Sequence, residues 1–445
     1  MLTPKQPVQA IAFFYVIIFA FPARSFDVDS AEDSLKSPDA MPGRATSEEC
    51  QPDSAGADNT RWPEHIGPFE FESDDGLSSI RPGLTLQLLF YCENEQTSSG
   101  IGQNSASIQS RRIRPTIRGN ILSRDIGYYL HLSTNVGSLE LMDLYFDFRI
   151  VPDLVVRAGQ CKIPFTRYRI MSFKNLTFPD WASLIKYFGA ERQMGLSLHN
   201  GYEKQNEFAY VLGVYTGQNA RASQATGLAR TYGISVANPS DLTDPAAPDE
   251  IHPELVGYFS YNYGGIDTKT DTDWNGGGLR FSLGLSAAWD IRPVKYVDIA
   301  QRVAPEFLLK VSNLSFFSAF FAGFVQDTYQ DESSDSGPAI TSALVQTSYL
   351  FMRRVEIIAR YAFVDVKNDI LEDARMMAES DADITPEDLE KIAFVNQEHE
   401  TALGINFYII GTSLKLQTDV AWLGTRLMNE ERDDVRVRSQ LTLTF

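Results

Sequence analysis

The last eleven residues of the chain, 435–445, alternate between apolar and polar side chains with a period of two. Val435, Val437, Leu441, Leu443 and Phe445 fall on one side of this pattern, and Arg, Gln and Thr residues fall between them. Successive side chains of a β-strand point to opposite faces, whereas an α-helix repeats about every 3.6 residues. These residues are therefore predicted to form a long strand with one apolar and one polar face. Such a strand must belong to a sheet whose two faces meet different surroundings.

The same period recurs from about residue 69 onward, and sixteen such segments begin near residues 80, 108, 126, 138, 153, 190, 206, 253, 277, 300, 314, 338, 353, 397, 412 and 433. Short connections near 123–125, 201–205, 312–313, 351–353 and 410–411 alternate with long ones near 93–107, 163–189, 217–252, 326–337, 366–396 and 424–432. This rhythm is typical of a transmembrane β-barrel. The sequence predicts an all-β fold, a transmembrane antiparallel β-barrel of about sixteen strands. Two connections depart from the rhythm: the loop near 137 is short and the turn near 265–277 is long.

The hydropathy of the chain fits this prediction. No apolar run is long enough for a membrane-spanning helix, which needs about eighteen residues or more. A closed barrel is the sheet that can lie in lipid without unpaired edges. A water-soluble β-sandwich is the alternative, but it rarely combines strands of this length with alternating short and long connections.

The N-terminal region has a different texture. Residues 11–21 form an apolar run between Lys5 and a small-residue stretch ending at Ser25, which predicts a signal peptide over 1–25; a buried hydrophobic helix is the alternative. Residues 26–67 predict an acidic disordered leader, and 68–445 the barrel domain. Export followed by barrel formation predicts the outer membrane of a Gram-negative bacterium.

The polar faces of the strands carry an excess of cations, although the whole chain has a formal net charge of -19, which argues against nucleic acid as a partner. Twelve basic residues are predicted to face inward, against the five acids Asp143, Asp147, Glu306, Glu356 and Asp419. A wall of that sign attracts small anions. The alternative is that the cations pair with acids and stiffen the wall. The inward basic set is Arg81, Arg112, Arg114, Arg118, Arg149, Arg157, Arg280, Lys310, Arg360, Lys415, Arg436 and Arg438.

The connection at 163–189 is the most unusual of the long loops. With its flanks it carries six basic residues, Lys162, Arg167, Arg169, Lys174, Lys186 and Arg192, and it holds seven aromatic ones. A loop folded back into the barrel would use the aromatic rings for packing while its cations narrow the passage. We therefore predict that this third external loop is in-folded; an aromatic-rich surface loop at the lipopolysaccharide boundary is the alternative.

A short motif at the start of this loop resembles a known family. Residues 156–165, with Arg157, Gly159, Gln160, Lys162 and a Pro-Phe pair, resemble the R-x-G-Q-x-K-x-P-F stretch of the phosphate-selective porin O/P family. Weaker matches follow in order at 69–76, in the arginine-rich second strand, at 191–195, at 359–361 and in the terminal strand. The resemblance implies a sixteen-stranded, homotrimeric outer-membrane porin whose third external loop constricts the pore. The acidic residues at 365–390 depart from what a dedicated phosphate collector would carry.

The predicted function is passive diffusion of small anions such as phosphate, without cofactor, metal or catalytic residues. The alternatives are a structural or adhesive barrel and a general, weakly selective porin. Residues 271–276 imitate the start of a calcium loop, but Ser282 stands where Glu is needed, so a plain turn is favoured. Phe445 resembles the terminal signature read by the barrel assembly machinery. The predicted anion pathway comprises Arg112, Arg114, Arg118, Arg157, Lys162, Arg167, Arg169, Lys174, Arg280, Arg360, Arg436 and Arg438.

Overall fold

The computed structural model describes residues 69–95, 103–135, 138–188, 192–202, 206–216, 253–291, 299–325, 338–380, 394–428 and 431–445. The strands are β1 (Phe71–Glu72), β2 (Ser79–Glu95), β3 (Gln103–Ile121), β4 (Ser123–Asn135), β5 (Ser138–Val151), β6 (Leu154–Lys162), β7 (Arg192–His199), β8 (Phe208–Tyr215), β9 (Glu254–Tyr263), β10 (Arg280–Asp290), β11 (Ile299–Val311), β12 (Leu314–Val325), β13 (Ile340–Phe351), β14 (Val355–Val366), β15 (Val395–Ile410), β16 (Leu414–Leu427) and β17 (Glu431–Thr444). The helical segments are α2 (Arg167–Ile170), η1 (Phe173–Asn175), α3 (Ile185–Phe188) and α6 (Asn368–Ser380).

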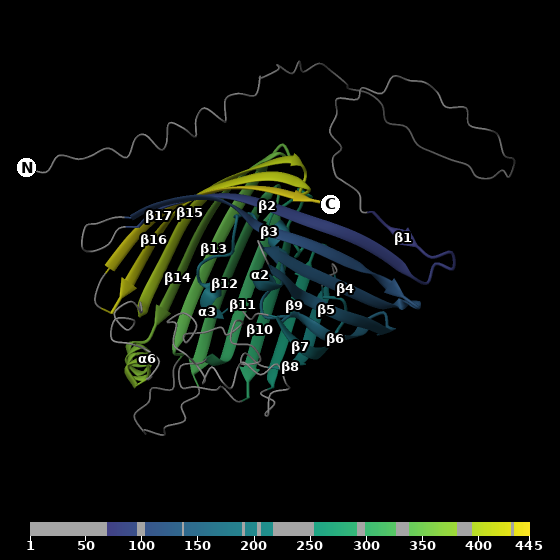
Figure 1. Cartoon of the computed structure of the whole chain (residues 1–445), viewed down its shortest axis with the longest axis horizontal. Coiled ribbons are helices and arrows are strands. Elements are labelled where there is room, and N and C mark those ends of the chain that lie inside the picture. Colours follow the sequence, from purple (N-terminus) through teal and green to yellow (C-terminus); the bar gives the residue numbers. More distant parts are fainter. Residues whose placement is uncertain are drawn as a thin grey trace, which may run out of the picture. The chain divides into compact units, whose positions relative to one another are not determined.

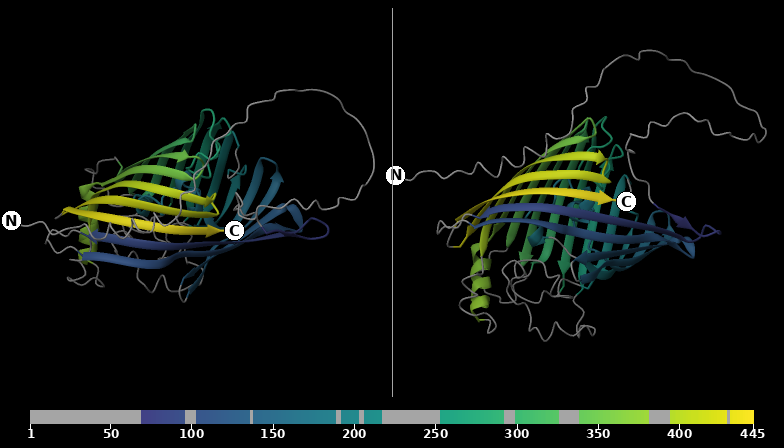
Figure 2. Two further views of the ribbon diagram at one scale, coloured as in Figure 1. Left: turned by 90° about the horizontal axis from the view of Figure 1, so that it is seen from above. Right: turned by 45° about the horizontal axis from the view of Figure 1, so that its top comes forward.

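The strands form one closed antiparallel barrel. Each strand from β2 to β16 pairs with the next, and β17 pairs with β2 from Thr444↔Thr85 to Asp434↔Glu95. In Figure 2 the yellow strands at the end of the chain lie beside the purple and blue strands at its beginning. The sheet counts seventeen strands, of which β1 is a two-residue addition to the start of β2, leaving sixteen in the ring. The predicted sixteen-strand barrel is confirmed.

The ends of the barrel differ in their connections. Tight turns join β3 to β4, β11 to β12, β13 to β14 and β15 to β16 at one end, whereas residues 163–188 and α6 follow strands that end at the opposite end (Figure 1). Both irregularities foreseen from the sequence are present: β4 and β5 are separated by residues 136–137 alone, and β9 and β10 by residues 264–279. The predicted signal peptide and leader lie outside the described residues. Among the described residues, no helix has the length and apolar character needed to cross a membrane.

The two faces of each strand meet different surroundings, as β10 illustrates. Leu283 and Leu285 are about half exposed on the outside of the barrel, whereas Arg280, Ser282 and Ser286 are buried on the inside. In β10 the outer face is therefore apolar and the inner face largely polar, which is the arrangement that the period-two pattern predicts.

A bulge in β3 changes the direction of the side chains. Leu88 of β2 pairs with Ser110 and the adjacent Gln87 pairs with Arg112, so Arg111 is an extra residue. A bulge interrupts the alternation of side chains across the strand. As a result, Arg111 and Arg112 both reach Asp180 inside the barrel, at 2.5 Å and 2.9 Å.

Candidate functional site

Residues 163–188, called here the lumen loop, connect β6 to β7. Thr166 caps α2 by accepting a hydrogen bond from the backbone N–H of Arg169, and η1 and α3 follow. Phe165, Tyr168 and Phe178 are at most 1% exposed. Aromatic rings buried to this degree need a packed environment, and the inner wall of the barrel supplies it.

The lumen loop packs against one side of the barrel. The Tyr168 ring lies 5.4 Å from that of Phe317, and the Phe188 ring lies 5.3 Å from that of Phe321, both on β12. The same hydrophobic cluster includes Leu344 of β13 together with residues of β14. The inner faces of β9–β16, with the segments packed on them, are called the packed side below.

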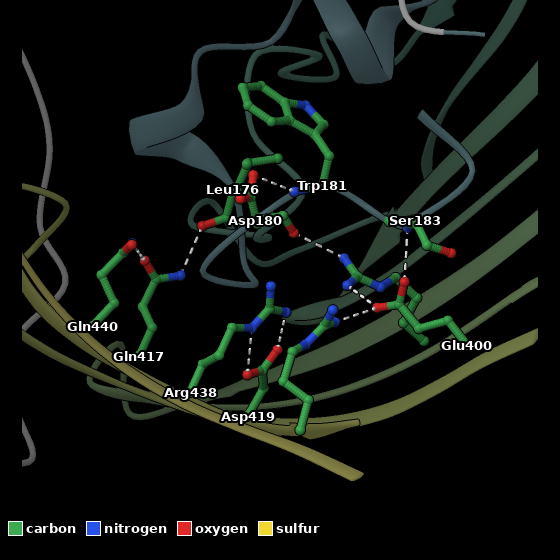
Figure 3. Close-up of polar contacts among 12 residues, drawn as sticks. Leu176, Asp180, Trp181, Ser183, Glu400, Gln417, Asp419, Arg438 and Gln440 are labelled. Carbon is green, nitrogen blue, oxygen red and sulfur yellow. Dashed lines mark hydrogen bonds and ion pairs between the residues drawn. The ribbon is translucent and has the colours of Figure 1, made fainter. Parts of the chain in front are cut away.

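Inward polar side chains hold the backbone of the lumen loop, as Figure 3 shows for β14–β17. Lys415 and Gln417 donate to the carbonyl of Leu176 at 2.8 Å and 3.0 Å. At the next turn of the loop, the backbone N–H of Ser183 donates to Glu400 at 2.7 Å. These bonds satisfy backbone groups that burial would otherwise leave without partners, so they fix the course of the loop.

Five of the predicted pathway arginines are buried in ion pairs. Their exposures do not exceed 7%, and each has a carboxylate partner. The pairs are Arg157–Asp147 at 2.7 Å, Arg167–Asp271 at 2.8 Å, Arg280–Asp273 at 2.9 Å, Arg360–Glu400 and Arg438–Asp419. Arg112 is also buried and pairs with Asp180, and Arg436 lies 3.4 Å from Glu400. For these residues the structure agrees with the alternative that inward cations pair with acids of the wall and loops.

The inner wall also carries acids that the sequence count of five omitted. Glu254 is buried and pairs with Arg302, while Glu398 and Glu400 line the inside of β15. The count failed at β15 because residues 396–401 are all polar, so no apolar side chain marks which face is outward. The inner wall therefore carries more acids than the count of five, and Arg302, an inward cation that the count of twelve also omitted, is paired with one of them.

A different environment surrounds Arg114 and Arg118 of β3 and Lys174 of η1. Arg114 and Lys174 are half-buried and Arg118 is exposed. Within the described part of the chain, none of the three has a carboxylate at ion-pair distance, and Arg118 and Lys174 are close enough to repel each other electrostatically. These predicted pathway residues therefore form no ion pair, although Glu140 and Asp143 lie close enough to Arg114 to attract it electrostatically.

Further cations gather around Trp181 of the lumen loop. The charged groups of Arg169, Lys162 and Arg112 lie 4.6 Å, 5.2 Å and 5.6 Å from the ring centroid. The indole N–H donates to the carbonyl of Tyr168 at 3.0 Å, which fixes the ring. The face of an indole attracts cations, so Trp181 holds three of them together. Trp181 is one of the seven aromatic residues of the loop that were expected from the sequence only to pack against the wall.

The inward side chains that keep solvent exposure lie mainly on β2–β5. They include Tyr91, Arg114, Tyr129, Tyr145 and the exposed Arg118. The inner faces of β2–β5 are called the open side below. Buried among them is a network in which Asp143 contacts His131 at 2.6 Å and Arg192 at 2.8 Å.

Comparison with known proteins connects this architecture to a family. Residues 90–263 match the family model of phosphate-selective porin O and P. The predicted resemblance is thereby confirmed over the end of β2, from residue 90 onward, and over β3–β9, a segment that includes the lumen loop. No curated protein matches the chain.

Two solved structures share the fold of this porin-like barrel. The outer membrane channel DcaP of Acinetobacter baumannii is similar with a TM-score of 0.52 and 12% identity, covering 84% of this chain and 99% of that one. Pseudomonas putida OprB, solved at high pH, is similar with a TM-score of 0.53 and 10% identity, covering 82% and 94%. At these identities the likeness concerns the fold alone.

The porin-like motif at 157–165 builds the base of the lumen loop. A Cβ on Gly159, whose φ is +130°, would lie 2.3 Å from the carbonyl oxygen of Leu144, so only glycine fits there. Gln160 donates to the carbonyls of Leu141 and Met142 at 3.0 Å and 2.8 Å, which satisfies a bulge in β5. Lys162 donates to two carbonyls of the loop. The motif therefore stabilises the base of the lumen loop, whether or not its cations also contact ions.

Proposed function

We propose that the chain is an outer-membrane porin, a passive diffusion channel that favours small anions. The closed barrel with an apolar outer surface, the match over residues 90–263 and the fold shared with DcaP, described as an outer membrane channel, support a channel. The passage runs along the open side, between β2–β5 and the lumen loop, which constricts it.

The preference for anions rests on one observation: Arg114, Arg118 and Lys174 face the open side without a carboxylate partner in the described part of the chain. Two unit charges 4 Å apart interact by about 1 kcal/mol in water and about 4 kcal/mol at the lower dielectric near a protein surface. An anion in the passage is stabilised by such contacts, and a cation is repelled. Phosphate is among the anions expected to pass.

The same proposal covers export and assembly. A signal peptide over residues 1–25 directs the chain to the outer membrane of a Gram-negative bacterium, where three copies form a trimer. The barrel assembly machinery reads the C-terminal strand with its final Phe445. In the barrel, the backbone of Phe445 exchanges two hydrogen bonds with Leu84, at 2.9 Å and 3.1 Å, at the seam between β17 and β2.

The test is the zero-current potential of purified protein in a planar bilayer with a KCl gradient. We expect defined conductance steps and a potential that indicates chloride preference. Replacing Arg114, Arg118 and Lys174 together by Glu reverses the sign of the potential, because six units of charge change along the passage.

Arg375 supplies the matched control, because it lies exposed on α6, outside the lumen, and pairs there with Glu379. Arg375→Glu leaves the potential unchanged. Potassium preference in the unmodified protein would refute the anion proposal and leave a general, weakly selective porin. A barrel without defined steps would favour a structural or adhesive role.

A further inference from the structure

The connection between β9 and β10, residues 264–279, is called here the inner turn. It belongs to the end of the barrel opposite to the lumen loop, because successive strands run in opposite directions. Ile266, Asp271 and Asp273 are at most 2% exposed, so the turn folds into the barrel interior instead of projecting from its end. Two in-folded segments, one from each end, therefore share the packed side.

The inner turn and the lumen loop are in direct contact. Arg167 of the lumen loop forms an ion pair with Asp271 at 2.8 Å, in which neither side chain is more than 5% exposed. Arg167 also donates to the carbonyl of Thr268 at 3.2 Å. Further along the loop, Asn175 donates to the carbonyl of Lys269 at 3.0 Å. The contact is polar and directional, and its ion pair is screened from water.

Asp271 reaches the lumen loop by a second route. Its other carboxylate oxygen accepts a hydrogen bond from Gln346 of β13 at 3.0 Å. The same amide nitrogen lies 2.9 Å from the hydroxyl of Thr177, in the middle of the loop. One carboxylate thus links the inner turn to the first turn of the loop and, through Gln346, to its centre.

The inner turn is itself anchored to the wall, independently of the loop. The ammonium group of Lys310 on β11 donates to the carbonyls of Asp267, Thr270 and Thr272 at 2.7 Å, 2.8 Å and 3.0 Å. The hydroxyl of Thr272 donates to Glu356 of β14 at 3.2 Å. A segment fixed at several points can serve as a rigid reference for another segment that contacts it.

We propose that Asp271 is a positioning residue that fixes the lumen loop from the opposite end of the barrel. By holding Arg167 and Gln346, it keeps the loop on the packed side and thereby sets the width of the passage along the open side. The proposal rests on the proposed channel function. It also assigns the buried Arg167 to loop placement and not to contact with passing ions.

Asp273 provides a matched control in the same turn. It is as buried as Asp271, at 1% exposure, but it pairs with Arg280 of β10 and accepts hydrogen bonds from the backbone N–H of Asn313, between β11 and β12, and of Gly276 within the turn. Loss of its charge disturbs the anchoring of the turn without removing a contact to the lumen loop. If both buried carboxylates only stabilised the turn, Asp271→Asn and Asp273→Asn would change the channel recordings in the same way.

The experiment compares single-channel recordings of the full-length wild type, Asp271→Asn and Asp273→Asn in KCl, after each has been shown to form a heat-modifiable barrel. The wild type is expected to give one main conductance level. Asp271→Asn weakens the hold on the first turn of the loop, around Arg167, while the wall contacts of Leu176 and Ser183 remain. It is therefore expected to give several sublevels with current fluctuations increased at least about twofold, whereas Asp273→Asn keeps one level. Equal recordings for both variants overturn the proposal.

Should Asp271→Asn not assemble, the double variant Arg167→Met with Asp271→Leu removes both charges of this pair, so neither is left buried alone. The nearby Glu306 loses the charge of Arg167 but keeps the hydrogen bond from the backbone N–H of residue 167. The double variant is expected to assemble and to show the same sublevels, because the hydrogen bonds to Thr268 and Gln346 are lost. Recordings like those of the wild type would overturn the proposal. A wild type without any conductance steps would instead refute the channel function on which the proposal rests.

Discussion

The packed side and the open side of the barrel use the same residue type for different tasks. On the packed side, Arg360 is 2% exposed, pairs with Glu400 and donates to the backbone of Asp180 at 3.1 Å. On the open side, Arg118 is exposed and has no carboxylate partner in the described part of the chain. Both are inward arginines on strands of the barrel, Arg360 on β14 and Arg118 near the end of β3. An inward orientation therefore does not identify an arginine of the ion pathway. Whether its charge is available to a passing ion depends on the carboxylates that neighbouring strands and loops place beside it.

The largest effect that separates the two sides is expected from Arg360→Met. It leaves Glu400 buried, with Arg436 at 3.4 Å as its remaining cation. Breaking a buried ion pair by removing one partner costs about 3–5 kcal/mol. We expect the midpoint of urea unfolding in detergent micelles to fall accordingly.

Arg118→Met is the control for this measurement, because the side chain is exposed and its loss leaves no buried charge. Its unfolding midpoint should stay within the error of the wild-type value, while the zero-current potential shifts towards potassium. Equal destabilisation by the two substitutions would contradict the division into a packed and an open side.

A smaller effect is expected from Trp181→Leu at the boundary between the two sides. Each cation near an aromatic face contributes about 0.5–2 kcal/mol, and Lys162, Arg169 and Arg112 share this ring. Without the ring the three cations lose this attraction, although Arg112 stays paired with Asp180 and Lys162 stays bonded to the loop carbonyls. The chloride preference should therefore fall by about twofold without reversing. Trp181→Phe, which keeps an aromatic face, should recover part of the preference. If Leu and Phe act alike, the ring serves only as packing volume.

The barrel was predictable from the sequence because lipid and lumen impose the period-two pattern on each strand independently. Arg280 and Leu283 reveal their faces through their immediate neighbours alone. The bulge at Arg111 is also visible in the sequence. Outward side chains of a regular strand are an even number of residues apart, whereas Ile108 and Ile113 are five apart. Such features are local, and local sequence suffices for them.

Ion pairing was not predictable in the same way, because it depends on residues far apart in the chain. Arg167 and Asp271 are 104 positions apart, and no periodicity connects a loop from one end of a barrel to a turn from the other. Asp271 and Asp273 resemble the start of a calcium loop in the sequence. The plain-turn interpretation fits better, because their carboxylates form ion pairs with Arg167 and Arg280. A motif shows which charged groups are present, and the fold determines which groups of opposite charge lie beside them.

The smallest effect is expected from the acids of α6, which connects β14 to β15 outside the ring of strands. Asp369, Glu372 and Glu379 are exposed. At physiological ionic strength, charges separated by more than about 8 Å of solvent are largely screened, whereas the cations of the open side act on an ion at close range. Replacing the three acids by Asn and Gln should therefore leave the zero-current potential nearly unchanged, although it removes three of the negative charges that make up the net charge of -19. A measurable increase in chloride preference would show that the external loops contribute to selectivity, and the contrast between packed and open sides would then not be sufficient to explain it. Repeating the recording at low ionic strength sharpens the test, because any contribution from α6 should grow as screening weakens.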